Sequence, residues 1–506
     1  MNPQLPIVNV LDTVRLMLPE IFLFVWALVV ITVDLITSRK NESVVGYTAL
    51  FGIVVTGILL IVAGDGVAFG NMFINDSLSL FFNIIFLGAA FMAIGSSFGL
   101  MRQKIQNHRG EFYGLIMFST VGMMFLAASH ELVSLYIGLE LTTIPLFVLA
   151  AFYKDDKLSI EAGIKYFVIG AFSSAMLLYG FSFLYGISGT TQLLQMSVNI
   201  ASIHLTHQDI GFTILIANVC ILAGIGFKLS LPPFHQWAPD VYEGAPTPVA
   251  SFLSVGSKAA GLVAFAKIFL IGLWGFIGAE MKPNDWGILV GIMSAVGMII
   301  GNVVAIRQTN IKRMLAYSSI AQAGYIMIGM LALNEHGISS VLFYTFVYLF
   351  ANMGAFAAVT VFEDKTGSTE ISNYKGLAQT SPFFAAVLSI FMLSLAGIPP
   401  LGGFMEKYKV FAAAVNQASI GRIDWMYWLV GIGLLTSVFS LYYYVNVIKQ
   451  MYFAKEKSVY TMTFNTPVFA VLVICLLGVL VTGLYPEPIL DFAQKVYFTF
   501  SFSVLP

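Results

Sequence analysis

The sequence predicts an all-α, polytopic membrane protein with about 14 transmembrane helices. Of its 506 residues, 58% are hydrophobic and only 10% are charged, whereas soluble domains carry about 25% charged residues. The mean hydropathy is +0.87, and apolar stretches of roughly 20 residues, the length that crosses a bilayer, recur along the chain. The net charge is −1, so no basic field favours binding to nucleic acid.

Apolar segments of spanning length define the individual helices. In chain order they cover residues 16–37, 44–64, 78–99, 112–128, 131–152, 162–187, 211–237, 247–274, 285–305, 313–333, 338–361, 381–415, 425–452 and 466–485. The first segment is long enough to span, and the residues before it lack the basic stretch of a signal peptide. We therefore interpret it as a transmembrane helix rather than a removed leader.

Basic residues are distributed unevenly over the loops between these helices. The loops after odd-numbered helices contain Arg39, Lys40, Arg102, Lys104, Arg109, Lys154, Lys157, Arg307, Lys312, Arg313, Lys365, Lys375, Lys449, Lys455 and Lys457. The other loops and the two tails contain only Arg15, Lys282, Arg422 and Lys495. Cytoplasmic loops of membrane proteins are enriched in Lys and Arg, so both termini are predicted on the non-cytoplasmic side.

Two of the predicted helices, the seventh and the twelfth, are interrupted by proline pairs. These pairs are Pro232-Pro233 and Pro399-Pro400. An odd offset of five helices reverses orientation, so the matched breaks predict two inverted repeats, a recurrent plan in transporters. The expected units are residues 1–111 (helices 1–3), 112–274 (first repeat, helices 4–8), 275–453 (second repeat, helices 9–13) and 454–506 (helix 14 and a tail).

Charged side chains inside the apolar segments are the candidate functional residues. Glu140 lies halfway through the fifth helix, Lys228 is deep in the seventh and Lys258 is near the centre of the eighth. Lys407 follows the break in the twelfth helix, which places it toward the outer half. Such residues are costly in lipid and mark ion paths. We expect Glu140 and Lys228 to form a switchable pair; a static buried ion pair, the alternative, stabilises poorly.

Three further residues have two interpretations each. His235, seven residues after Lys228, can relay a proton because its ring both donates and accepts, or it is a hydrogen-bonded interfacial histidine. Lys165 lies near the cytoplasmic end of its span, where snorkelling and a role in proton uptake are both open. Lys267 lies toward a helix end, where snorkelling is favoured over a proton-carrying role.

The sequence does not indicate a metal or redox centre. Cys220 and Cys475 lie in apolar spans and are interpreted as small buried hydrophobic residues. His204 and His207 have i,i+3 spacing, but in a predicted polar loop without Cys or Glu beside them, which disfavours a zinc site. The chain has no P-loop, no complete dinucleotide-binding fingerprint and no cysteine cluster for iron–sulfur.

Two long motifs resemble the antiporter-like membrane subunits of respiratory complex I. They are GFKLSLPPFHQWAPDVYEGAP at 226–246 and NIKRMLAYSSIAQAGY at 310–325. The resemblance covers almost the whole chain. Within this group the chain is most similar to the N type (subunit 2 in mitochondrial naming), through DVYEGAP at 240–246, FSSAMLLYG at 172–180 and SKAAG at 257–261.

The resemblance implies a role in a proton pathway for each buried charge. The residues that match the family's motif positions are Glu140, Lys165, Lys228, His235, Lys258 and Lys407. Glu406 departs from the family, which usually has a glycine before the last lysine. A carboxylate at this position either modulates Lys407 or faces elsewhere.

The resemblance further implies a proton-translocating subunit of a bacterial-type NADH:quinone oxidoreductase in the inner (plasma) membrane. The chain would hold no cofactor itself, and NADH, flavin, iron–sulfur clusters and quinone would belong to other subunits. Its partners would be the other membrane-arm subunits, including neighbouring antiporter-like ones, the lipid bilayer, protons and water. The first alternative is a subunit of a cation/proton antiporter, or of a ferredoxin- or hydrogenase-linked complex. The second alternative is a structural membrane scaffold.

Overall fold

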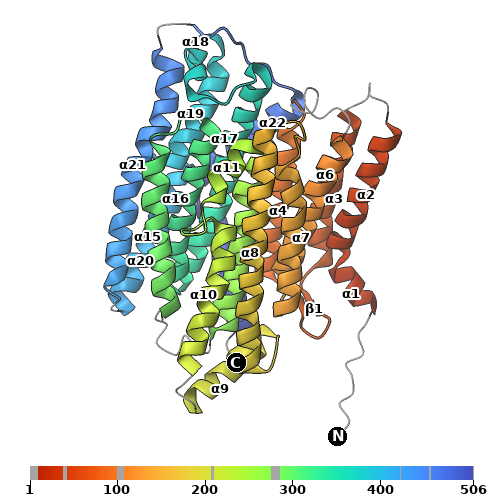
Figure 1. Ribbon diagram of the computed structural model, residues 1–506, viewed down its shortest axis with the longest axis vertical. Coiled ribbons are helices and arrows are strands. Elements are labelled where there is room, and N and C mark those ends of the chain that lie inside the picture. Colours follow the sequence, from red (N-terminus) through yellow and green to blue (C-terminus); the bar gives the residue numbers. More distant parts are fainter. Residues whose placement is uncertain are drawn as a thin grey trace.

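The protein is a bundle of long helices whose axes run in a similar direction (Figure 1). The computed structural model describes residues 10–37, 43–99, 108–206, 210–274, 285–421, 423–454 and 457–504. Within these ranges, 13 helices are long and apolar enough to cross a membrane. The predicted class, an all-α polytopic membrane protein, is therefore confirmed.

The spanning helices match the predicted segments to within a few residues, apart from the longer α8 and α17 and from α10, which ends eight residues before the predicted segment 211–237 does. They are α2 (Leu18–Ile36), α3 (Ser43–Ala63), α4 (Ser77–Ser96), α6 (Arg109–Ala128), α7 (Leu132–Ala150), α8 (Lys157–Ser188), α10 (Ile210–Leu229), the continuous helix Thr247–Gly272, α15 (Asp285–Ala305), α16 (Ile311–Leu331), α17 (Glu335–Thr366), α21 (Trp425–Phe453) and α22 (Thr466–Leu484). The remaining predicted span, 381–415, is divided into α19 (Pro382–Ala396) and α20 (Gly402–Gly421).

The helix Thr247–Gly272 is enclosed by the rest of the bundle along its whole apolar window. It contains α12 (Thr247–Phe252), the π-helical turn η2 (Leu253–Ser257), α13 (Lys258–Phe265) and the π-helical turn η3 (Ala266–Gly272). A π-helical turn inserts an extra residue and so changes which way the following side chains point; such turns are frequent at functional sites. Two of them flank α13, which begins at Lys258.

Both proline pairs lie in gaps between helices. The first gap follows Leu229, and the chain resumes as α11 (Trp237–Gly244). The second separates α19 from α20. In each gap one residue adopts a left-handed conformation, Ser230 with φ 56° and Gly397 with φ 86°. These breaks leave backbone carbonyl groups without helical partners inside the bundle.

Several elements were not expected from the sequence. Residues 193–206, which reach into the predicted polar loop around His204, form the helix α9 (Leu193–Thr206), and the predicted tail contains α23 (Glu487–Val504). The other additions are α1 (Val10–Leu16), the antiparallel pair β1 (Gly66–Ala68) and β2 (Phe73–Asn75), the 3₁₀ turn η4 (Ile371–Tyr374) and α18 (Leu377–Thr380). Elements this short or this polar give no spanning signal.

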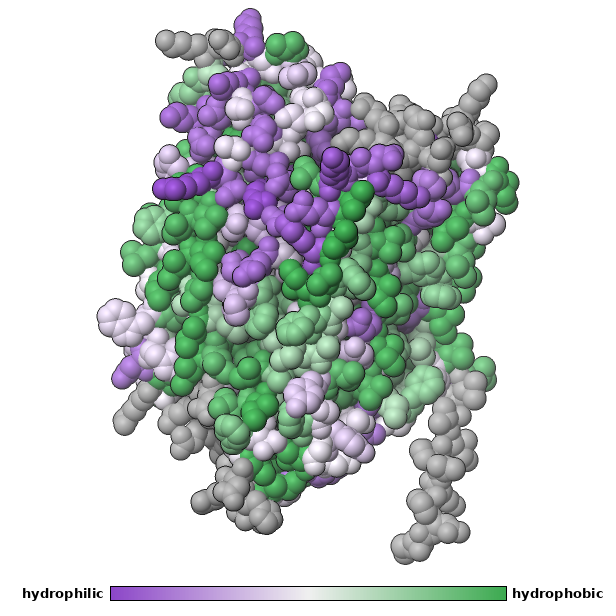
Figure 2. Space-filling view, viewed as in Figure 1, coloured by the Kyte–Doolittle hydropathy of each residue, from purple (hydrophilic) through white to green (hydrophobic). Residues whose placement is uncertain are grey.

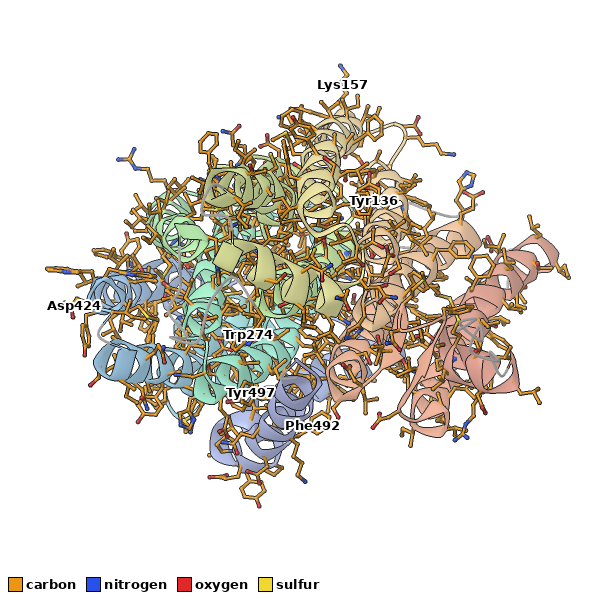
Figure 3. All side chains as sticks on the ribbon, turned by 90° about the horizontal axis from the view of Figure 1, so that it is seen from below. Tyr136, Lys157, Trp274, Asp424, Phe492 and Tyr497 are labelled. Atoms are coloured by element: carbon orange, nitrogen blue, oxygen red, sulfur yellow. The ribbon has the colours of Figure 1, made fainter. Side chains whose placement is uncertain are left out.

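The two ends of the bundle differ in composition. The C-terminus, α1 and α9 lie at one end, and α18 lies at the other (Figure 1). Near the first end, Phe492 of α23 contacts Phe81 of α4, with ring centroids 6.0 Å apart (Figure 3). Hydrophilic side chains gather toward the α18 end of the face drawn in Figure 2, above a broad apolar surface. That apolar surface fits contact with lipid.

Some residues used in the sequence analysis lie outside the described part of the structure. They are Arg39, Lys40, Arg102, Lys104, His207, Lys282, Arg422 and Lys455, together with the side chain of His204. The orientation of the chain in the membrane therefore stays a prediction.

Candidate functional site

Lys228 is anchored between two helices in the bundle interior. It lies in the last turn of α10 and is only 5% exposed. Its Nζ donates a hydrogen bond to Oγ1 of Thr143 on α7. A lysine so deep in a membrane protein needs a polar partner, and here a hydroxyl group supplies it.

Glu140 lies one turn before Thr143 on α7, partly buried. It makes no ion pair within 4.0 Å with Lys228, and its Oε1 is buried without a hydrogen-bond partner among the described residues. The two charges are nevertheless close enough to interact electrostatically. The structure therefore places Glu140 on α7 and Lys228 on α10, with Thr143 rather than Glu140 in contact with the lysine.

Lys258 lies at the centre of the bundle and is 4% exposed. Its Nζ donates to the backbone oxygen of Ser319 on α16. Close approach of its helix to α10 depends on Gly261, where a Cβ atom would lie 3.1 Å from Cβ of Lys228. The small residues around Lys258 thus bring the helices that carry the two lysines into contact.

Neutral polar side chains continue from Lys258 toward the second break. The hydroxyl of Tyr348, on α17, donates to Oγ of Ser319 over 3.0 Å. One turn earlier on α17, the Tyr344 hydroxyl donates to Oε1 of Gln322 on α16. All four side chains are buried. They form a polar seam between α16 and α17 in the interior of the bundle.

Gln322 connects this seam to Lys407 through one backbone carbonyl. Nε2 of Gln322 donates to the oxygen of Leu395 over 3.1 Å, and Nζ of Lys407 donates to the same oxygen over 3.0 Å. Lys407 also donates to the oxygen of Ala396 over 3.2 Å and to Oγ of Ser437 over 3.2 Å. Polar contacts thus extend from Lys258 to the Ser319–Tyr348 pair, and from the Gln322–Tyr344 pair to Lys407. The two pairs lie one turn apart along α16 and α17.

The break in the twelfth span provides the carbonyl groups to which Lys407 donates its hydrogen bonds. The last carbonyl groups of α19 have no helical partners and carry the negative end of the helix dipole. The Lys407 ammonium group occupies this position and lies 5.1 Å from the ring centre of Tyr325. Gly397 allows the turn, since its φ is 86° and a Cβ atom there would lie 3.1 Å from Cδ of Lys407.

Glu406 is completely buried, and neither carboxyl oxygen has a hydrogen-bond partner among the described residues. It interacts electrostatically with Lys407 and with Tyr344 and Tyr348 on α17. An unsatisfied buried carboxyl group is costly. Glu406 therefore lies beside the seam and Lys407 and does not face lipid.

Lys165 and His235 lie away from the buried seam. Lys165 of α8 has a 40% exposed side chain and contacts Asp240 and Glu161, each at 2.6 Å. Arg313 also contacts Asp240, at 2.7 Å, so Lys165 belongs to an ion cluster around α11. His235 is half-buried in the first break, and its Nδ1 has no hydrogen-bond partner among the described residues.

The expectation that Lys267 snorkels to the membrane surface is wrong. Its side chain is 0% exposed, and its Nζ lies 3.1 Å from Nδ1 of His130. Snorkelling requires a side chain that follows the lipid-facing side of a helix to the interface. The enclosed helix Thr247–Gly272 offers no such side.

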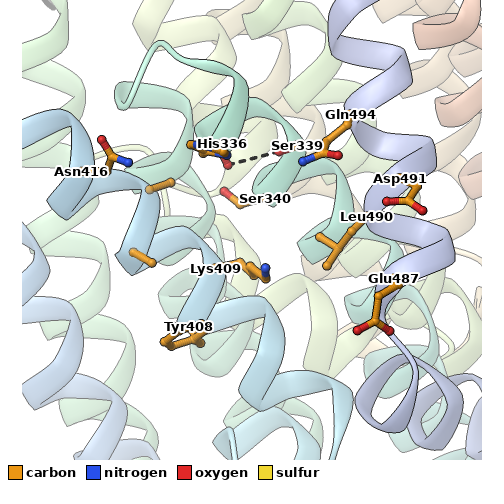
Figure 4. A pocket seen from close by; sticks show the side chains of 12 residues that line it. His336, Ser339, Ser340, Tyr408, Lys409, Asn416, Glu487, Leu490, Asp491 and Gln494 are labelled. Carbon is orange, nitrogen blue, oxygen red and sulfur yellow. Dashed lines mark hydrogen bonds between the residues drawn. The ribbon is translucent and has the colours of Figure 1, made fainter. Parts of the chain in front are cut away.

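A charged pocket lies between α17, α20 and α23 (Figure 4). Lys409, two residues after Lys407, lines it together with His336, Glu487 and Asp491. The pocket gives α20 a polar environment next to the C-terminal helix.

No potential metal site of three or more His, Cys, Asp or Glu side chains occurs among the described residues. Cys220 and Cys475 are free and buried, as expected for small hydrophobic residues. The described site is thus a set of lysines, hydroxyl groups, an amide and two carboxyl groups, which suits proton movement more than group transfer.

Known proteins with similar sequences span nearly the whole chain. Residues 129–440 match the family described as NADH:quinone oxidoreductase/Mrp antiporter, transmembrane. The chain is 40% identical over 479 residues to an NADH-quinone oxidoreductase subunit N from Desulforamulus reducens, covering 94% of this chain and 96% of that one. It is 44% identical over 444 residues to NAD(P)H-quinone oxidoreductase subunit 2 from Gloeobacter violaceus, covering 87% and 82%.

Solved structures share the same architecture. A chain of respiratory complex I from Thermus thermophilus superposes with a TM-score of 0.76 at 28% identity, covering 94% of this chain and 99% of that chain. A chain of an archaeal membrane-bound sulfane sulfur reductase gives 0.81 at 22% identity, covering 98% and 100%. A chain of the Mrp complex from Dietzia gives 0.77 at 16% identity, covering 96% and 97%. The last two similarities concern the fold alone.

Proposed function

This chain belongs to the NADH:quinone oxidoreductase/Mrp antiporter transmembrane family, and from this premise we propose that it is the proton-translocating subunit N of an NADH:quinone oxidoreductase. The observation that carries the proposal is the buried set of contacts between Lys258 and Lys407. A structural scaffold needs no charged groups at this depth, where they are costly. A proton carrier does need them.

Protons pass along this set through groups that both give and accept them. Lys258 contacts the backbone oxygen of Ser319, and water passes its proton on to the hydroxyl groups of Ser319 and Tyr348, each of which donates and accepts. Gln322 and the Leu395 carbonyl hold their neighbours in position, and water carries the proton past these two amide groups. The proton then resides on Lys407, whose ammonium form the carbonyl groups at the end of α19 stabilise.

Glu140 and Lys228 control the supply of protons to Lys258. When the pair is closed, Glu140 neutralises the Lys228 ammonium group. When Glu140 is drawn away by a neighbouring subunit, the ammonium group keeps only the Thr143 hydroxyl and releases its proton toward Lys258. Lys165 and His235 serve the uptake of protons from the α18 end, where the partly exposed Lys165 contacts carboxylates of the ion cluster.

Two inverted repeats, 112–274 and 275–453, underlie this arrangement. In support, each contains one broken spanning helix, and in each break a side chain donates to a backbone carbonyl group near the end of the helix that precedes the break. In the first, Nε1 of Trp237 donates to the oxygen of Phe227 over 3.1 Å. In the second, Lys407 donates to the oxygens of Leu395 and Ala396.

Electron transfer belongs to other subunits under this proposal. NADH, flavin, iron–sulfur clusters and quinone are held there, and this chain contacts other membrane-arm subunits and lipid. The chain resides in a bacterial-type inner membrane with both termini outside the cytoplasm, and basic residues in the loops of the α18 end support this orientation. The nearly full-length similarity to subunit N proteins favours this assignment over a cation/proton antiporter or a ferredoxin- or hydrogenase-linked complex.

The experiment removes a relay hydroxyl without removing volume. Tyr348→Phe takes away the group that contacts Ser319, and proton uptake per electron by vesicles containing the assembled complex should fall several-fold. Tyr374→Phe is the matched control, because Tyr374 is also buried and its hydroxyl has no hydrogen-bond partner among the described residues. Unchanged uptake in the Tyr348→Phe complex would refute a path through this seam.

A further inference from the structure

Lys267 does not contact the described seam, yet it is the most deeply buried lysine of the enclosed helix, with no exposed surface. It lies in η3, nine residues after Lys258 on the same helix, which corresponds to roughly 13 Å along the axis. A buried ammonium group must have a compensating partner. That partner comes from the loop between α6 and α7.

His130 links Lys267 to a carboxylate. Its Nδ1 lies 3.1 Å from Nζ of Lys267, and its Nε2 lies 4.0 Å from Oδ2 of Asp76. The imidazole ring is 5% exposed, whereas the Asp76 side chain is 14% exposed. Exposure to solvent thus increases along the three groups, from the fully enclosed Lys267 to the partly exposed Asp76 carboxylate at the N-terminus of α4.

The ring is suited to transfer protons between its two neighbours. Burial, and then the charge of Lys267, lower the pKa of His130 below its usual value, so the ring is neutral at physiological pH. In the neutral ring one nitrogen donates and the other accepts. With Nδ1 accepting from the Lys267 ammonium group, Nε2 carries the hydrogen and points toward Asp76.

We propose that Asp76, His130 and Lys267 form a second outlet, which connects Lys258 to the aqueous phase at the end of the bundle that holds the C-terminus. This inference rests on the proposed proton-carrying function. The geometry that supports it is the buried contact between Lys267 and Nδ1 of the imidazole, together with the partly exposed carboxylate near Nε2 of the same ring.

The transfer balances without any co-reactant. Lys267 gives one proton to Nδ1 of His130, and Nε2 gives its proton to the Asp76 carboxylate. The products are a neutral amine, a neutral ring in the other tautomer, and a carboxylic acid that releases its proton to water. A small shift of the Asp76 side chain closes the 4.0 Å gap. The new Nδ1–H donates to the Ala128 oxygen, 3.3 Å away, until water takes the Nδ1 proton and returns one to Nε2, which restores the first tautomer.

The structure offers a substitution at Asp76 that keeps the fold. Asp76 is the N-cap of α4, and its Oδ1 accepts a hydrogen bond from the Ser79 amide over 2.7 Å. Asparagine caps helices as well as aspartate does, so Asp76→Asn removes the proton acceptor and retains the cap. Ser79→Ala weakens the capping box alone and is the matched control.

The test measures protons taken up per electron by vesicles that contain the assembled complex. Asp76→Asn and Lys267→Met should each lower this ratio, and Lys267→Met combined with Lys407→Ala should lower it to the value of Lys258→Met. Ser79→Ala should leave the ratio unchanged. A wild-type ratio in both Asp76→Asn and Lys267→Met, with a reduced ratio in Lys258→Met, would overturn the outlet and leave the proposed function intact. A wild-type ratio in Lys258→Met would instead overturn the proposed function.

Discussion

Replacing Lys228 by arginine separates the charge of this residue from its ability to release a proton. Arginine retains a cation that can contact Thr143 on α7, where Lys228 now donates its hydrogen bond. The bundle should therefore assemble. Arginine stays protonated in proteins, so the step that hands a proton to Lys258 should fail.

The size of the expected effect follows from the pKa values of the free arginine and lysine side chains. The pKa of free arginine lies about 2 to 3 units above that of free lysine, and each unit corresponds to about 1.4 kcal/mol. The same environment then makes proton release from arginine about 3 to 4 kcal/mol more costly, which lowers the rate at least about 100-fold. Proton uptake by reconstituted vesicles, normalised to the amount of assembled complex, is the assay. Full uptake by the Lys228→Arg complex would refute the switch.

Three further outcomes are expected. Lys407→Ala should lower proton uptake through this subunit, leaving the part carried by the second outlet, while partner subunits still assemble, as judged by native electrophoresis; loss of the whole complex from the membrane would favour a purely structural role. Glu406→Gly restores the residue usual in the family and removes an unsatisfied buried carboxyl group, so uptake should change less than twofold, and a severe loss would make Glu406 part of the path. A reporter active only in the cytoplasm, fused after Pro506, should be silent, and a bright fusion would reverse the predicted orientation.

The charged members of the site could be found from the sequence because they stand out in apolar segments. Glu140, Lys228, Lys258 and Lys407 each interrupt a hydrophobic run, and the burial of the three lysines agrees with that signal. What the pattern could not give is which groups touch. Thr143, rather than Glu140, contacts Lys228, and this depends on side-chain orientation.

The neutral side chains of the seam were not identified from the sequence. Ser, Thr, Tyr and Gln are common in membrane helices, so Tyr344 and Tyr348 carry no distinguishing signal. Ser319 and Gln322 lie within the motif NIKRMLAYSSIAQAGY, and their i,i+3 spacing on one helix face was a usable but unused indication.

Lys267 shows a different limit of the sequence. The position of Lys267 toward a helix end favoured snorkelling. Whether a helix faces lipid or is surrounded by protein, however, is a property of the packed bundle. The enclosure of helix Thr247–Gly272 reverses the interpretation. The helices α9 and α23 were missed because the search required spanning length and strong hydrophobicity.

The central claim is that protons cross the membrane through the buried lysines of this chain. Lys258→Met tests it most directly, because Lys258 lies where the supply from Lys228 meets both the seam and the proposed second outlet. We predict that vesicles containing the assembled Lys258→Met complex take up fewer protons per electron than the wild type, whereas the exposed-loop control Lys375→Met matches the wild type. A wild-type ratio of protons to electrons in the Lys258→Met complex would contradict the account.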